Sequence, residues 1–211
     1  KRPSNQTTNA PDNSKSESKN PEDVQKDCLV AHNEYRAKHE DTPSLEWDED
    51  IAMGAKEWAE NMLETGMRHS SQEERKNAGE NLYYDAGTAS VGGTPCQRAS
   101  DSWYREALRY NFNTGKGSGV LHFTQMVWKS TTKVGCGVSK GQVRGMETTY
   151  VCCRYQPAGN MIGSETKNVM KLKDGMSVQD AVKEDPWKTN KRNSLHKNAK
   201  KMTKSGKRNV L

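Results

Sequence analysis

The sequence has few of the features that mark a protein packed along its whole length. Hydrophobic residues make up 31 % of its 211 residues, and only two residues are phenylalanine. No apolar run approaches the roughly 18 residues of a membrane-spanning helix, so no such helix is expected. No internal repeat is visible, which argues against a solenoid.

The apolar residues that are present gather in the middle of the chain. Residues 1–21 contain one, Ala10, and residues 165–211 contain 13 of 47. The other 52 lie among the 143 residues from 22 to 164, a length that can bury one sizeable core. The sequence therefore predicts one domain over residues 22–164, with a polar N-terminal tail (1–21) and a basic C-terminal extension (165–211).

Acidic residues are missing from the end of the chain. Residues 186–211 contain nine Lys and Arg but no Asp or Glu, so the net charge of +6 comes from the extension. Such runs are usually solvated and disordered. A surface for sulfated glycans or anionic membranes is the alternative. Without interleaved aromatic residues, no specific nucleic-acid partner is expected.

Several catalytic and metal-binding motifs are also absent. The chain has no CxxC pair, HExxH helix or GxSxG elbow, which argues against a structural zinc site, a typical metalloprotease and an α/β-hydrolase. Gly115-Lys116 lacks the remaining pattern of a phosphate-binding loop. Ser70 and Ser71 adjoin His69, but no oxyanion donors can be identified for a serine triad.

Five cysteines are present, at positions 28, 96, 136, 152 and 153. Cys136 and Cys153 lie in strand-like segments, and neighbouring antiparallel strands could bring them within bridging range. The odd total leaves at least one thiol free or intermolecular. The chain begins at Lys1 rather than Met, which fits a mature secreted form whose leader has been removed. We expect a secreted protein, with peripheral attachment to Golgi or other membranes as the alternative.

Hydrophobic spacing predicts three helices and three strands. The helices begin at Pro21, at Asp48 and near Ala99, and the third continues to Tyr110. The strand-like segments are 81–84, 134–139 and 147–156, and the segments 84–97 and 111–119 are expected to be surface loops. Helices before and beside an antiparallel sheet give an α+β or a layered α-β-α arrangement.

Glu106 is the most informative single residue. It lies three residues after Trp103 and four before Tyr110, so it projects beside the face that these aromatics bury. An ionised carboxylate there needs a partner, because burying it alone costs several kcal/mol or forces protonation.

Three other polar residues are candidate partners of Glu106. His69, Glu80 and His122 lie in apolar contexts or at loop–strand junctions, whereas His39 falls in an exposed stretch at the end of the first helix. Any one of them alone is more often a core or helix-end side chain satisfied by the backbone. Together with Glu106 they favour a shared polar cavity.

Seven segments carry a more specific signal: HNEYR (32–36), RHSS (68–71), GENL (79–82), WYREALRYNF (103–112), HFTQMVWKST (122–131), VGCGV (134–138) and YVCCRYQPAGN (150–160). In this order they resemble the signatures of the CAP superfamily, which includes cysteine-rich secretory proteins, insect venom antigens and pathogenesis-related proteins. The chain looks most like its Golgi-associated and secreted single-domain members. The resemblance covers about residues 22–164 and implies a three-layer α-β-α sandwich.

The resemblance also implies a site. The family's cavity tetrad falls on His69, Glu80, Glu106 and His122. In relatives the two imidazoles, here His69 and His122, can hold a divalent metal, usually zinc, with the carboxylates nearby through water. Two protein nitrogens alone would bind such an ion weakly.

The cysteine pattern carries over only in part. The resemblance implies a strand-to-strand disulfide between Cys136 and Cys153. It gives no partners for Cys28, Cys96 or Cys152. No cysteine follows Cys153, so the cysteine-rich appendage that gives some relatives ion-channel activity is absent.

One loop corresponds to a lipid-binding element of relatives. The stretch 109–119 occupies the place of the sterol-binding loop of lipid-exporting members, and its Tyr110 and Phe112 are candidates to contact an apolar ligand. The alternative is that both rings fill the core. Leu121 stands where relatives usually carry a small or charged residue.

These observations favour a secreted, non-catalytic binding protein whose cavity and loops engage a lipid, such as a sterol, or a protein partner, with a divalent metal as modulator. A zinc-dependent hydrolase is the first alternative, with the metal on His69 and His122 and Glu80 or Glu106 as general base. Tethering to glycans or anionic membranes through the basic extension is the second, and it is compatible with either function.

Overall fold

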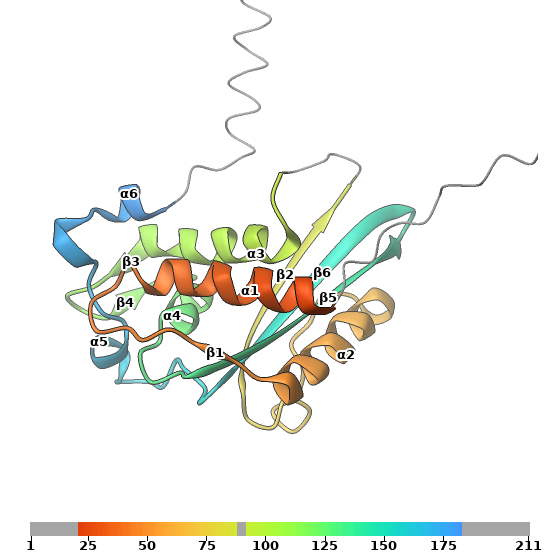
Figure 1. Ribbon diagram of the computed structural model, residues 1–211, viewed down its shortest axis with the longest axis horizontal. Helices are drawn as coiled ribbons and strands as arrows, with labels where there is room; N and C mark the ends of the chain where they lie inside the picture. The colour runs from red at the N-terminus through yellow and green to blue at the C-terminus, as the bar shows by residue number, and fades with distance from the viewer. Residues whose placement is uncertain (1–20, 88–91, 183–211) are drawn as a thin grey trace, which may run out of the picture.

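The structure, a computed structural model, describes residues 21–87 and 92–182 (Figure 1). Its centre is a four-stranded sheet in the order β1-β5-β6-β2. The strands are β1 (Glu46–Trp47), β2 (Gly79–Ala86), β5 (Lys133–Val143) and β6 (Met146–Gln156). β6 runs antiparallel to both β5 and β2, whereas β1 runs parallel to β5.

Helices cover both faces of this sheet (Figure 1). α2 (Glu49–Thr65) packs on one face, and α1 (Pro21–Arg36), α3 (Pro95–Tyr104) and α4 (Leu121–Met126) lie on the other. Alternating residues of β6 supply the two cores, because Cys152 packs with α2 whereas Cys153 packs with the α1–α3 layer. The expected three-layer α-β-α fold is confirmed.

α2 and β5 approach each other unusually closely. A Cβ atom on Gly135 would lie 2.2 Å from the backbone nitrogen of Ala52, and one on Gly137 would lie 2.1 Å from the Cα of Lys56. Neither distance is possible for a real side chain, so glycine at these two positions sets how near the helix can sit to the sheet.

The expected third helix is wrong in its bounds. α3 begins earlier, at Pro95, where the Thr94 hydroxyl accepts a hydrogen bond from the Gln97 amide at 3.1 Å. It ends at Tyr104, and the chain continues as a 3₁₀ helix, η1 (Arg105–Arg109). A tightened last turn is common at a helix end because it satisfies terminal carbonyls.

The strands are longer than the sequence indicated. β5 and β6 meet at Arg144-Gly145, two residues with positive φ angles of 52° and 79°, which is typical of a tight hairpin turn. β2 continues to Ala86, inside the first expected loop. The second loop contains a small hairpin of β3 (Tyr110–Asn111) and β4 (Lys116–Gly117).

The packed part of the chain extends beyond the expected boundary at residue 164. Residues 165–182 include α5 (Glu165–Asn168), η2 (Lys173–Gly175) and α6 (Val178–Ala181). Val169 and Ala181 are buried in the α1–α3 core. The N-terminal tail and the rest of the basic extension lie outside the described residues.

His39 was expected to be exposed, and this is wrong. Its Nδ1 lies 2.7 Å from the carbonyl oxygen of Met170 and its Nε2 lies 2.8 Å from the hydroxyl of Tyr104. The segment after residue 164 covers the end of α1, which buries the imidazole completely.

Two disulfides join the elements. Cys136–Cys153 connects β5 to β6, as the resemblance implies, and Cys28–Cys96 connects α1 to α3. Cys152 is a buried free thiol, and burial raises its pKa. The sulfurs of Cys28, Cys136 and Cys153 lie within 4.8 Å of one another, but all three are engaged in disulfides and offer no thiolate to a metal.

Candidate functional site

Two histidine–carboxylate pairs make up the candidate site. His69 Nδ1 lies 2.8 Å from Glu80 Oε1, and His122 Nδ1 lies 2.7 Å from Glu106 Oε1. Among the described residues, neither imidazole Nε2 has a hydrogen-bond partner. The His69 side chain is 55 % exposed and that of His122 is 33 % exposed, so both rings are accessible to solvent.

The Glu80 carboxylate is buried on β2 and densely hydrogen-bonded. Besides His69, it accepts bonds from the Ser70 amide at 3.0 Å, the Ser70 hydroxyl at 2.5 Å and Arg154 Nε at 3.1 Å. Burial alone raises the pKa of this carboxyl, but the bonds from His69, Ser70 and Arg154 outweigh it and lower the pKa of Glu80 to about 2. Glu80 is therefore ionised at neutral pH.

The Glu106 carboxylate links η1 to the start of α4. It accepts the backbone N–H groups of His122 at 3.0 Å and Phe123 at 3.2 Å. These are amides that the helix itself leaves unpaired, so the carboxylate satisfies them and fixes the position of His122. The His122 ring also stacks on Trp103, with ring centroids 6.2 Å apart.

A buried network connects the two pairs. Asn81, the residue after Glu80, donates its amide to the His122 carbonyl at 3.0 Å and to the Tyr155 hydroxyl at 3.2 Å. The same hydroxyl lies 2.8 Å from His32 Nε2. The sheet edge that carries Glu80 is thereby joined to the helix that carries His122.

The sequence did not identify Asn81 or Arg154 as part of the site, and it considered Ser70 only as a nucleophile. Ser70 instead donates its hydroxyl to Glu80. Arg154 had a detectable signal, because a cation within an otherwise apolar strand requires an acidic partner.

Tyr110 is buried and Phe112 is partly buried, and both rings lie in an aromatic cluster. Tyr110 is 5.0 Å from Phe112 and 5.4 Å from Phe123 between ring centroids. The Tyr110 hydroxyl is buried and has no hydrogen-bond partner within residues 21–87 and 92–182. Burial, with a further contribution from Glu165, raises the pKa of Tyr110 to about 12.

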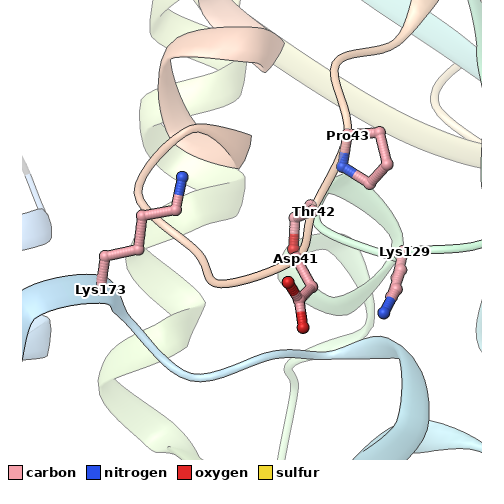
Figure 2. Close-up of a pocket in the computed structure, with 5 residues that line it drawn as sticks. All are labelled: Asp41, Thr42, Pro43, Lys129 and Lys173. Carbon is pink, nitrogen blue, oxygen red and sulfur yellow. The ribbon is translucent and has the colours of Figure 1, made fainter.

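Two shallow hollows lie elsewhere on the surface. The first is lined by Asp41, Thr42, Pro43, Lys129 and Lys173, and Figure 2 shows that its residues come from the loop after α1, the loop after α4 and η2. The second is lined by Asn77, Thr132, Lys133, Gln156, Pro157 and Ala158. No residue of the tetrad lines either hollow.

The tetrad contains residue types that bind divalent metals, namely two imidazoles and two carboxylates. Each carboxylate binds the Nδ1 of its imidazole, which directs Nε2 outward as the ligand atom, an arrangement common around zinc. His69 and His122 would supply two nitrogens, and water or a ligand would have to complete the coordination.

Comparison with known proteins points to the same family as the sequence motifs. The model of the cysteine-rich secretory protein family (CAP) matches residues 29–155. The chain is 38 % identical over 143 residues to protein PRY2 of Saccharomyces cerevisiae, covering 67 % of this chain and 39 % of that protein. It is 38 % identical over 138 residues to the human Golgi-associated plant pathogenesis-related protein 1, covering 64 % and 84 %. It therefore spans about two fifths of the yeast relative.

Solved structures support the same fold. BmVAL-1 superimposes with a TM-score of 0.58 at 26 % identity, covering 72 % of this chain and 84 % of that one. The structure titled NaASP2 with Zn²⁺ gives 0.54 at 23 % identity, covering 83 % and 100 %. In the described part of the chain, no helix combines the length and apolarity needed to cross a membrane.

Proposed function

The chain belongs to the cysteine-rich secretory protein (CAP) family. From this we propose that it is a secreted, non-catalytic protein that binds a sterol or similar lipid. The proposed site lies beneath the β3–β4 hairpin, next to the histidine tetrad. Relatives include a protein named as secreted, from Candida albicans, and the Golgi-associated human protein.

The proposal rests on the unpartnered Tyr110 hydroxyl. Tyr110 is the first residue of β3, which pairs with β4 through only two residue pairs, and its ring lies in the aromatic cluster. A buried hydroxyl without a partner is costly, and a ligand that supplies an acceptor would remove that cost. A sterol matches this surrounding, because it joins a rigid apolar body to one hydroxyl. Such a short hairpin is the kind of element that opens locally.

The state of the carboxylates supports a binding role. The Glu106 carboxylate is hydrogen-bonded to two backbone amides and to the His122 imidazole. The Glu80 carboxylate is hydrogen-bonded to Ser70, Arg154 and His69. A general base needs a free lone pair directed at the substrate. With these bonds made, both carboxylates act to position the imidazoles, and a divalent metal on His69 and His122 would modulate binding.

Titration with fluorescent cholesterol tests the proposal. Tyr110→Phe removes only the hydroxyl and keeps the ring, so the fold is retained while affinity falls about fivefold, the worth of one hydrogen bond. Tyr84→Phe, at a half-exposed position on β2, is the matched control and binds like wild type. No saturable binding by the wild type would overturn the proposal.

A zinc-dependent hydrolase is the second candidate, because the carboxylate–imidazole pairs also suit a zinc ligand set. The zinc-loaded protein is assayed with peptide and ester substrates beside Glu80→Gln and Glu106→Gln. Turnover that both substitutions abolish would establish this candidate and contradict a purely binding role.

A further inference from the structure

Three large apolar side chains project from one place near the tetrad. Met161 and Ile162, consecutive residues in the turn after β6, are 59 % and 98 % exposed, and Leu121 at the start of α4 is 65 % exposed. Asn160 donates its amide to the Leu121 carbonyl at 2.9 Å, which places the turn beside Leu121. We call Leu121, Met161 and Ile162 the apolar tip. Isolated exposed apolar residues are ordinary, but three at one point indicate an interaction surface.

The apolar tip is held in place. The Thr124 hydroxyl, one turn into α4, donates to Asn160 Oδ1 at 2.6 Å. The amide of Ser164 bonds to the Met161 carbonyl at 3.0 Å, which closes the turn on its other side. The exposed side chains are therefore presented by a fixed backbone.

The two segments of the chain that contain the apolar tip carry a net positive charge, whereas α2 is acidic. Residues 105–129 contain four basic residues and one acidic, and residues 157–175 contain three basic and two acidic. α2, on the other face of the sheet, contains five acidic residues and one basic. Lys129 and Lys173 from these segments line one hollow, together with Asp41 (Figure 2).

We infer that the apolar tip inserts into the interfacial region of an anionic phospholipid bilayer, with the basic segments against the head groups and α2 facing the solution. Apolar insertion combined with basic residues at the surface is how peripheral proteins recognise such bilayers. A second copy of this chain fits less well, since pairing through the tip would bring two basic faces together. The inference goes beyond the proposed function, because it requires no sterol.

Sedimentation of the full chain with sterol-free vesicles tests the inference. The vesicles are phosphatidylcholine alone or with roughly 30 % phosphatidylserine. The double variant Met161→Ser with Ile162→Ser is expected to bind the anionic vesicles at least about tenfold more weakly, because the buried methylene groups are lost. Met53→Ser with Met146→Ser, which alters two methionines 58 % and 51 % exposed elsewhere, is the matched control and binds like wild type.

A reporter residue tests insertion directly. Ile162→Trp is expected to show additional fluorescence that brominated acyl chains quench, whereas Met53→Trp is not quenched. Equal binding by the two double variants, equal binding to neutral vesicles, or no quenching at position 162 would each overturn the inference. So would tip-dependent self-association without vesicle binding, which would assign the surface to a second copy. Because cholesterol titration uses no vesicles, failure of docking and failure of the proposed function are distinguishable.

Discussion

At the scale of single residues, Arg36 shows how one side chain can join distant segments. Its buried guanidinium donates to the carbonyls of Pro43 at 2.8 Å, Met126 and Trp128 at 2.9 Å each, and Thr131 at 3.1 Å. All four acceptors are backbone carbonyls. Burial lowers the pKa of Arg36 to about 10, so it stays charged at neutral pH. The end of α1 is thus tied to the segment that follows α4.

Arg36→Lys is expected to destabilise the fold by at least about 2 kcal/mol, because an ammonium cannot reach four divergent carbonyls and each lost charged bond is worth roughly that much. Urea unfolding followed by tryptophan fluorescence measures the change. The exposed Arg68→Lys serves as control. Equal midpoints for Arg36→Lys and wild type would show that the four bonds contribute nothing net.

The buried histidines give the fold a defined pH dependence. Burial lowers the pKa of both His32 and His39 from 6.5 to about 4. Between these values the unfolded chain binds more protons than the folded one, so the free energy of unfolding decreases as pH falls from 6.5 to 4. Each histidine contributes up to about 3 kcal/mol over this window. The depressed pKa of Glu80 acts in a separate window, where stability is lost as pH falls from 4.5 towards 2.

His39→Gln removes one of these titrating groups. We expect a smaller decrease of the free energy of unfolding between pH 6.5 and 4 in this variant than in wild type, as measured by urea unfolding at several pH values. The comparison uses slopes, so a lower stability of the variant at neutral pH does not affect it. Parallel curves would mean that His39 titrates normally in the folded protein.

Metal binding also belongs to the residue scale. Calorimetric titration with Zn²⁺ is expected to show weak binding to wild type, as two protein nitrogens allow, and at least about tenfold weaker binding to His122→Ala. Loss of the same size in Glu106→Gln would support its role in orienting His122. Unchanged binding in both variants would place the metal elsewhere.

At the scale of elements, local sequence predicts best where a local interaction decides the structure. Asp48 caps α2 by accepting the Ile51 amide at 3.1 Å, and helical spacing indicated this start correctly. The third helix was placed wrongly at both ends. Its start at Pro95 follows a local cap, Thr94, that hydrophobic spacing did not show. Its end at Tyr104 leads into η1, where Glu106 bonds to the amides of His122 and Phe123 in another element. Strand ends likewise depended on pairing with neighbours.

The contact between α2 and β5 yields an element-scale prediction. Gly137→Ala is expected to destabilise the protein by about 1–3 kcal/mol or more, because the added methyl group would force the helix away from the sheet. Thermal unfolding measures this effect. Gly92→Ala, at a position with no neighbour within 4 Å, is the matched control. Equal melting temperatures for the two variants would contradict the close approach.

At the scale of the whole molecule, the C-terminal extension (165–211) has two parts, a first part that packs onto the domain and a later part that is strongly basic. Residues 165–182 complete the fold by covering His39 and adding Val169 and Ala181 to the core. Removing Lys188–Arg208, which lies outside the described residues, is expected to weaken retention on heparin at low salt while thermal unfolding stays unchanged. Unchanged retention would contradict a tethering role for the extension.

The sequence by itself determined the family and the layered fold, because these depend on residue identity, spacing and hydrophobic period. It also named the four polar residues of the tetrad, whose joint role stays a prediction. It did not determine the Cys28–Cys96 bond, the burial of His39 or the pairing of each histidine with its own carboxylate. Those features arise when segments far apart in the chain meet in space. Local sequence patterns do not indicate which distant segments will meet. The tertiary structure also decided that the Tyr110 hydroxyl has no partner among the described residues, since only packing removes both water and alternative acceptors.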